Sequence, residues 1–161
     1  MKNIHLFTTK KELINGSNSI TNFQKKEIKL PQILFITTFP PRECGIATYS
    51  QDLVLALNNQ FKKSFDIKIE ALELQNEKHS YTEDIFSVLE TDNPNSYVEL
   101  DKNINKNKAL EIVLIQHEFG LFRENEEDFI SFLKSVNKPV IVVFHTVLPR
   151  ADEKLIKHVQ E

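Results

Sequence analysis

The chain has 161 residues, of which 40% are hydrophobic and 27% charged, and this predicts one soluble globular domain with a sizeable core. Its 20 basic and 23 acidic residues give a net charge of −3, which excludes a general attraction to nucleic acid or to an anionic membrane. The single cysteine excludes an intramolecular disulfide. Because the sequence shows neither a secretory signal nor an apolar run of about 20 residues, we expect a cytoplasmic protein.

The first 31 residues are polar, with lysine, asparagine, serine and threonine outnumbering scattered apolar positions. The run Asn15–Asn18 is typical of a turn or a flexible segment. We therefore expect residues 1–31 to be a partly flexible N-terminal extension that could pair at a sheet edge. The domain proper is expected to run from residue 32 to residue 161.

Strand and helix patterns alternate from residue 32 onward. Apolar runs typical of strands are found at Gln32–Thr38, Phe65–Leu74, Asp84–Leu89, Glu111–Gln116 and Val140–Phe144. Apolar residues at helical spacing predict helices over Ile46–Phe61, Asn95–Asn107, Glu124–Val136 and from about Asp152 onward. In the first of these helices, the expected apolar stripe is Ile46, Tyr49, Leu53, Ala56, Leu57 and Phe61. The polar run Gln75–Thr82 predicts a loop.

This alternation predicts an α/β, Rossmann-like three-layer domain with a mostly parallel sheet. Right-handed crossovers place the carboxyl ends of all parallel strands at one edge of the sheet. Three loops that carry reactive side chains would then gather at that edge, namely Pro40–Gly45, His117–Gly120 and His145–Arg150. Ligands of open α/β sheets are usually received at this edge.

The first of these loops leads from a strand into the start of a helix. Gly45 at the head of that helix could let backbone N–H groups approach an anion, although it could equally serve only the turn. Arg42 could pair with a phosphate or a carboxylate, whereas a lone loop arginine is more often simply solvated. Cys44 is a less favoured nucleophile, because small packing cysteines are commoner.

The other two loops begin with histidines. His117 and Glu118 follow one buried strand, and His145 follows the next. Histidine can donate to a sugar hydroxyl, shuttle a proton or bind a metal, and a carboxylate can accept from hydroxyls. The structural alternative is that these imidazoles only satisfy loop carbonyls; we favour function for His145, because it directly follows an all-apolar strand. Cys44, His117, Glu118 and His145 lack metal-ligand spacing, so no metal is expected.

Three segments together resemble the N-terminal half of a retaining glycosyltransferase of family 4, which has the GT-B fold. They are Phe39–Tyr49 (FPPRECGIATY), Gln116–Phe122 (QHEFGLF) and Phe144–Pro149 (FHTVLP). Their order and spacing also match, and the similarity runs from about Ile33 to the last residue.

Enzymes of this family have two Rossmann-like domains that face a cleft, and the N-terminal domain binds mainly the acceptor. The resemblance implies that Gly45 lies in the loop that meets the donor diphosphate and that His145 contacts the transferred sugar. It also implies that His117 and Glu118 line the acceptor side. The implied reaction transfers a hexose, with retained configuration, from a nucleoside-diphosphate sugar to a glycan or a lipid-linked sugar. Most such enzymes need no metal or other cofactor.

This sequence departs from the family pattern in two ways. Cys44 precedes Gly45, where many relatives have a Gly-Gly pair. The donor-binding C-terminal domain is missing, so the resemblance implies a fragment that is inactive alone and needs that domain as a partner. The family also leaves open a peripheral contact with the inner face of the membrane.

Two further classes of function compete with the transferase. The chain could be a non-catalytic Rossmann-like module that binds a sugar, a nucleotide or a protein partner. A small hydrolase or metal-dependent enzyme built on the two histidines is the weakest reading, because the sequence has neither a G-x-S-x-G nor an H-E-x-x-H motif.

Overall fold

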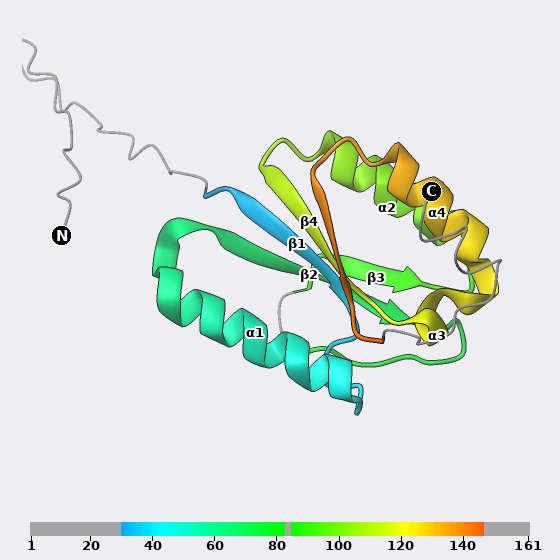
Figure 1. The fold of residues 1–161 in the computed structure, drawn as a ribbon, viewed down its shortest axis with the longest axis horizontal. Coiled ribbons are helices and arrows are strands. Elements are labelled where there is room, and N and C mark those ends of the chain that lie inside the picture. Colours follow the sequence, from blue (N-terminus) through cyan, green and yellow to red (C-terminus); the bar gives the residue numbers. More distant parts are fainter. Residues whose placement is uncertain (1–29, 83–84, 147–161) are drawn as a thin grey trace, which may run out of the picture.

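Five strands form one all-parallel sheet in the computed structural model, which describes residues 30–82 and 85–146. The strands are β1 (Gln32–Thr37), β2 (Asp66–Glu73), β3 (Ser87–Glu90), β4 (Leu110–His117) and β5 (Val140–Phe144). Their order across the sheet is β3-β2-β1-β4-β5 (Figure 1). The predicted α/β fold with a parallel sheet is therefore confirmed.

The helices connect successive strands. They are α1 (Gly45–Phe61), α2 (Pro94–Lys106), the short α3 (Phe119–Phe122) and α4 (Glu126–Ser135), with 3₁₀ turns at Lys62–Ser64 and Arg123–Asn125. Asn93 caps α2, because its side-chain oxygen accepts from the Asn95 N–H at 3.1 Å, and proline occupies the first helical position. Acidic residues fill the first turn of α4, where the helix dipole favours negative charge.

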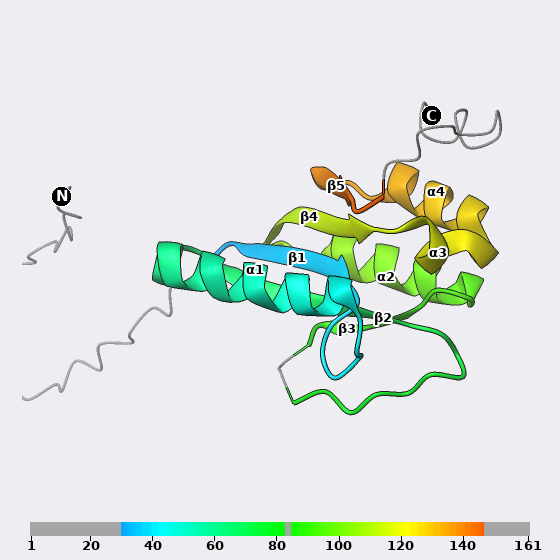
Figure 2. The ribbon, with the colours of Figure 1, turned by 60° about the horizontal axis from the view of Figure 1, so that its bottom comes forward.

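Helices cover both faces of the sheet, which gives three layers (Figure 2). The α2 and α4 side holds the larger cluster, in which Leu34 and Ile36 of β1 pack with Leu100 and Phe132 among others. The α1 side holds a smaller cluster built on Phe35, Phe39 and Ile69. Since β1 buries alternate residues into both clusters, it is the central strand of the fold.

The buried stripe of α1 differs from the expected one. Its fully buried residues are Ala47 and Ser50, whereas Tyr49 and Phe61 are 46% and 48% exposed. A buried hydrogen bond of 2.6 Å between the hydroxyls of Thr37 and Ser50 joins α1 to β1. Leu53 and Leu57 of the expected stripe do pack against the α1-side cluster. Near its start, however, α1 meets the sheet with a face of small and polar residues. An apolar count alone cannot detect such a face.

The strand boundaries differ from the predicted ones by a few residues. The third strand begins at Ser87 instead of residue 84, and β4 extends to His117. The polar run from Gln75 to Thr82 contains no helix or strand, as expected. The N-terminal extension and the helix expected from about Asp152 lie outside the described residues, except for Leu30 and Pro31. Among the described residues, no helix is long and apolar enough to cross a membrane.

Candidate functional site

The ends of β4 and β5 bring two of the predicted loops together. The backbone N–H of His145 donates to the carbonyl of His117 at 3.0 Å, which continues the β4–β5 ladder by one residue. Because the strands are parallel, the two loops leave the sheet at its carboxyl edge side by side. The sequence-based expectation that these loops meet is confirmed.

His145 directly follows β5, the outermost strand at this end of the sheet, and is itself exposed. Its ring Nε2 is 2.6 Å from Oε1 of Gln116, the penultimate residue of β4. Its ring also meets that of Tyr49 edge-on, with centroids 5.1 Å apart. His145 is therefore held by β4 on one side and by the first turns of α1 on the other.

The start of α1 is closed by the cysteine of the first loop. Cys44 is the N-cap, and its sulfur accepts from the Ala47 N–H at 3.4 Å and lies 3.2 Å from the Thr38 hydroxyl. Gly45 is the first helical residue, and a Cβ added there would meet nothing within 4 Å. A small side chain would therefore fit at Gly45, and its value for an anion would come from the helix terminus and not from a lack of space.

Glu118 stands next to this edge but has a partner within the chain. Its carboxylate accepts a short hydrogen bond from the hydroxyl of Thr146, the residue after His145. This bond joins the loops after β4 and β5 a second time. Glu118 can still accept from a ligand hydroxyl, because a carboxylate offers about four lone-pair positions.

His117 lies in the interior and is only 8% exposed. Four phenylalanine rings surround it with centroids 5.0 to 5.5 Å away, and they are Phe119, Phe122, Phe129 and Phe144. Its Nδ1 has no hydrogen-bond partner among the described residues. Burial lowers the pKa of His117, and the nearby carboxylates of Glu118 and Glu126 oppose this effect only in part. His117 therefore packs as a neutral ring in the α4-side core.

Arg42 is also engaged within the chain. Its Nη1 lies 3.0 Å from Glu77 Oε2, in an ion pair without the alignment of a hydrogen bond, and 3.5 Å from the carbonyl of Leu72. These contacts hold the first loop against the polar run after β2. The pair is only partly exposed, and the Glu77 Oε2 atom itself is buried, so an anionic ligand that drew Arg42 away would leave this carboxylate oxygen without its counter-charge.

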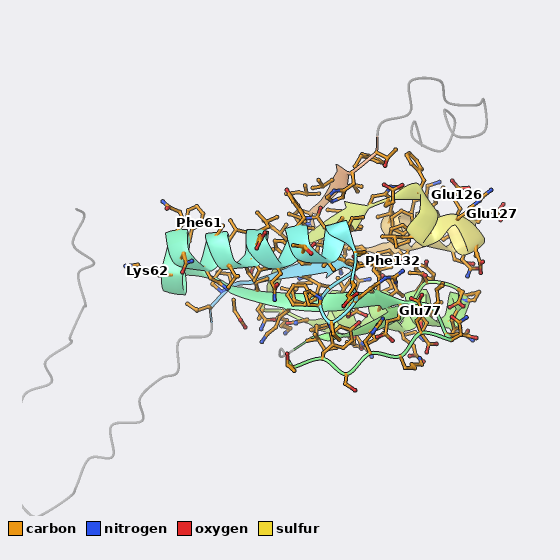
Figure 3. The ribbon with its side chains drawn as sticks, turned by 90° about the horizontal axis from the view of Figure 1, so that it is seen from below. Phe61, Lys62, Glu77, Glu126, Glu127 and Phe132 are labelled. Carbon is orange, nitrogen blue, oxygen red and sulfur yellow. The ribbon has the colours of Figure 1, made fainter. Side chains whose placement is uncertain are left out.

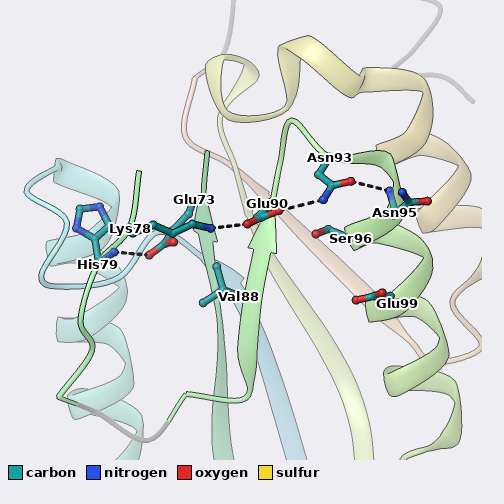
Figure 4. Close-up of a pocket in the computed structure, with 9 residues that line it drawn as sticks. All are labelled: Glu73, Lys78, His79, Val88, Glu90, Asn93, Asn95, Ser96 and Glu99. Carbon is teal, nitrogen blue, oxygen red and sulfur yellow. Dashed lines mark hydrogen bonds and ion pairs between the residues drawn. The ribbon is translucent and has the colours of Figure 1, made fainter. Parts of the chain in front are cut away.

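A separate pocket of about 410 Å³ lies between β3 and the start of α2 (Figure 4). It is therefore at the opposite end of the strand order from β5. Its lining includes Lys78, which pairs with Glu90, and Glu90 also accepts from the Asn93 side chain at 3.0 Å. Glu73 in its wall accepts from the His79 N–H at 3.0 Å. Several polar groups of this pocket therefore bind one another, whereas Nε2 of His79 is buried without a hydrogen-bond partner among the described residues. None of the residues predicted from sequence lines the pocket.

Sequence reasoning missed two residues that hold His145. The sequence patterns place Gln116 at the end of a strand and Tyr49 in an apolar helix stripe, and neither pattern predicts a contact with His145. A signal for Gln116 does exist, because a glutamine closing an otherwise apolar buried strand must find a partner. For Tyr49 the sequence offers no comparable signal, since its contact depends on where β5 lies relative to α1.

We call the group of Gly45, Tyr49, Gln116, Glu118, His145 and Thr146 the carboxyl-edge site. It combines a helix N-terminus, an anchored imidazole and a carboxylate, which can together bind an anionic group and hydroxyls. In residues 30–82 and 85–146, no three His, Cys, Asp or Glu side chains are grouped so that they could hold a metal ion. Comparisons with family models, with curated proteins and with solved structures found no match for this chain.

Proposed function

We propose that this chain is the acceptor-side half of a retaining glycosyltransferase, which transfers a hexose from a nucleoside-diphosphate sugar. The observation that carries the proposal is the anchoring of His145 beside the first turns of α1. A sugar diphosphate has an anionic end and a hydroxyl-rich end. The N-terminus of α1 suits the anionic end, and the His145 imidazole, which contacts Tyr49 of the same helix, suits the hydroxyl-rich end.

Within this proposal each residue of the edge has a defined part. The backbone at Gly45 faces the donor diphosphate, His145 contacts the transferred sugar, and Glu118 accepts from acceptor hydroxyls. His117 contributes by packing beneath the loop that carries Glu118. Arg42 would bind substrate only after leaving Glu77. The nucleotide pocket is assigned to a second Rossmann-like domain, so we expect no turnover from these 161 residues alone.

A non-catalytic binding module of the same fold is the second candidate. It is favoured by the engagement of Arg42 with Glu77 and by the burial of His117, which leave fewer free groups at the edge. The downstream coding sequence separates the two candidates. A second Rossmann-like domain that carries paired glutamates favours the transferase, and a stop codon directly after Glu161 favours the module.

The direct test is sugar transfer by the product of the complete reading frame. Radiolabelled nucleoside-diphosphate hexoses are incubated with the protein and with saccharide or lipid-linked acceptors, and the anomeric configuration of any product is determined by NMR. We expect a labelled product with retained configuration. Binding of donor or saccharide without turnover would instead support the module.

A further inference from the structure

We propose that Gln116 fixes the protonation pattern of His145, so that Nε2 carries the proton and Nδ1 is left as a hydrogen-bond acceptor for a sugar hydroxyl. Gln116 is thus a positioning residue, which acts through His145. The contact of Nδ1 with a sugar hydroxyl rests on the proposed function. The position of the proton on Nε2 depends only on Gln116 and His145.

The assignment follows from what the two atoms can do. An amide oxygen accepts and never donates, so a hydrogen bond to Gln116 Oε1 requires a proton on Nε2 of His145. The separation of 2.6 Å is slightly below the usual N–H···O range of about 2.7–3.2 Å. The opposite arrangement, in which an amide N–H donates to the ring nitrogen, would place two larger nitrogen atoms at this distance. The contact therefore favours the oxygen as partner.

Gln116 is well placed to impose this choice. Its side chain has no exposed surface, and it lies in β4 between β1 and β5, so it cannot follow a rotating ring. The backbone bond from His145 to His117 fixes the main chain, and the Tyr49 ring limits rotation on the α1 side. Nδ1 of His145 makes no hydrogen bond within residues 30–82 and 85–146. The residue itself is exposed.

The other half of the Gln116 amide argues against a purely structural role. Its Nε2 is buried without a hydrogen-bond partner among the described residues, which is unfavourable for the fold. An apolar side chain of similar size would fill this position of β4 without that loss. A buried polar group without a hydrogen-bond partner breaks a general rule of protein structure, and such exceptions are expected at functional sites. We infer that the glutamine serves the imidazole of His145.

NMR of the ¹⁵N-histidine-labelled 161-residue chain tests the tautomer at pH 8, with His145→Gln used to assign the signals. We expect His145 to show a protonated Nε2, with its proton protected from water, and an unprotonated Nδ1. Gln116→Glu keeps an acceptor and should keep this protected proton. Gln116→Leu should lose it through exchange, while its melting temperature stays equal to the wild-type value or rises.

Two results would overturn the proposal. One is a wild-type His145 with its proton on Nδ1, which would mean that the amide donates to the ring; this readout needs no variant to fold. The other is a Gln116→Leu chain that keeps the protected Nε2 proton and melts at a lower temperature, as a merely structural glutamine would. The NMR test uses the chain without sugar donor or acceptor, so its result does not depend on the proposed function. If the complete protein failed to transfer sugar, that failure would count against the proposed function and leave the tautomer assignment standing.

Discussion

The ring of Tyr49 in α1 stands edge-on to the ring of His145 at the end of β5, with their centroids 5.1 Å apart. This contact joins helix α1, which follows the first loop, to the residue that follows β5 at the carboxyl edge of the sheet. Tyr49 is 46% exposed, so the contact is made at the surface and not in the core. A surface contact of this kind positions a side chain without adding much stability.

Removing the Tyr49 ring should therefore weaken sugar transfer more than folding. An edge-on aromatic contact is worth about 0.5–1.5 kcal/mol, so we expect Tyr49→Ala to lower kcat/KM of the complete protein by roughly tenfold or less. Tyr49→Phe keeps the ring and serves as the matched control. Equal kcat/KM for Tyr49→Ala and wild type would show that the ring does not position His145.

His117 should make the fold less stable in acid. Burial lowers its pKa in the folded state, so folding favours the neutral ring. This contribution to stability is complete above the unfolded-state pKa of about 6.5 and declines as the pH falls toward the folded-state pKa. In urea unfolding at pH 7.5 and pH 5, His117→Phe should lose less stability on acidification than wild type. An unchanged pH dependence in both His117→Phe and His117→Leu would contradict this.

Glu70 should act in the opposite direction. It lies buried in β2, where it accepts from the Ser87 hydroxyl, and burial raises its pKa to about 7. The folded state therefore favours the protonated carboxyl, and this contribution is present below the unfolded-state pKa and lost as the pH rises through about 7. Above that pH, the buried carboxylate is charged, which lowers the free energy of unfolding.

The neutral analogue Glu70→Gln should remove this destabilisation. At pH 8.5 we expect it to raise the free energy of unfolding by on the order of 2–3 kcal/mol, with the difference shrinking toward zero near pH 4. Urea unfolding at both pH values measures the effect, and Glu99→Gln on the exposed face of α2 is the control. A constant difference across the pH range would mean that Glu70 does not titrate as described.

Lys62 at the end of α1 offers a stabilising substitution. Its backbone has φ 50° and ψ −118°, a sparsely populated positive-φ conformation that costs an L-residue on the order of 1–3 kcal/mol. Figure 3 shows it beside Phe61, at the end of α1 away from Glu77 and the carboxyl edge. Lys62→Gly should raise the free energy of unfolding by roughly 0.5–1 kcal/mol without affecting sugar transfer. Lower stability of the glycine variant in chemical denaturation would refute the strain at this position.

Much of the fold could be predicted from the sequence because apolar runs and helical spacing are local signals. The segment Val140–Phe144 was predicted with its observed bounds, and β1 to within one residue. The expected stripe of α1 was correct only in part: Leu53 and Leu57 pack against the core, whereas Tyr49 and Phe61 are exposed. Near the start of the helix, a buried hydroxyl pair, Thr37 with Ser50, meets the sheet instead. Such a pair joins two elements and leaves no periodic trace in either one.

The site was predictable only in part for the same reason. The position of His145 follows from the apolar strand before it and from the parallel order of the sheet. Its partner Gln116 could be identified only once β4 and β5 were known to be neighbours. Burial of His117 likewise depends on phenylalanines from three elements, α3, α4 and β5, which a sequence pattern does not bring together.

The most direct test of the proposed transferase is sugar transfer by the complete protein carrying His145→Ala, compared with His79→Ala. His79 belongs to the loop after β2 and lines the pocket beside β3, the strand farthest from β5. With both variants folded by circular dichroism, we expect His145→Ala to lose most of the kcat/KM for hexose transfer and His79→Ala to keep it. Near-normal turnover of His145→Ala would contradict the central role given to this histidine and to the carboxyl-edge site.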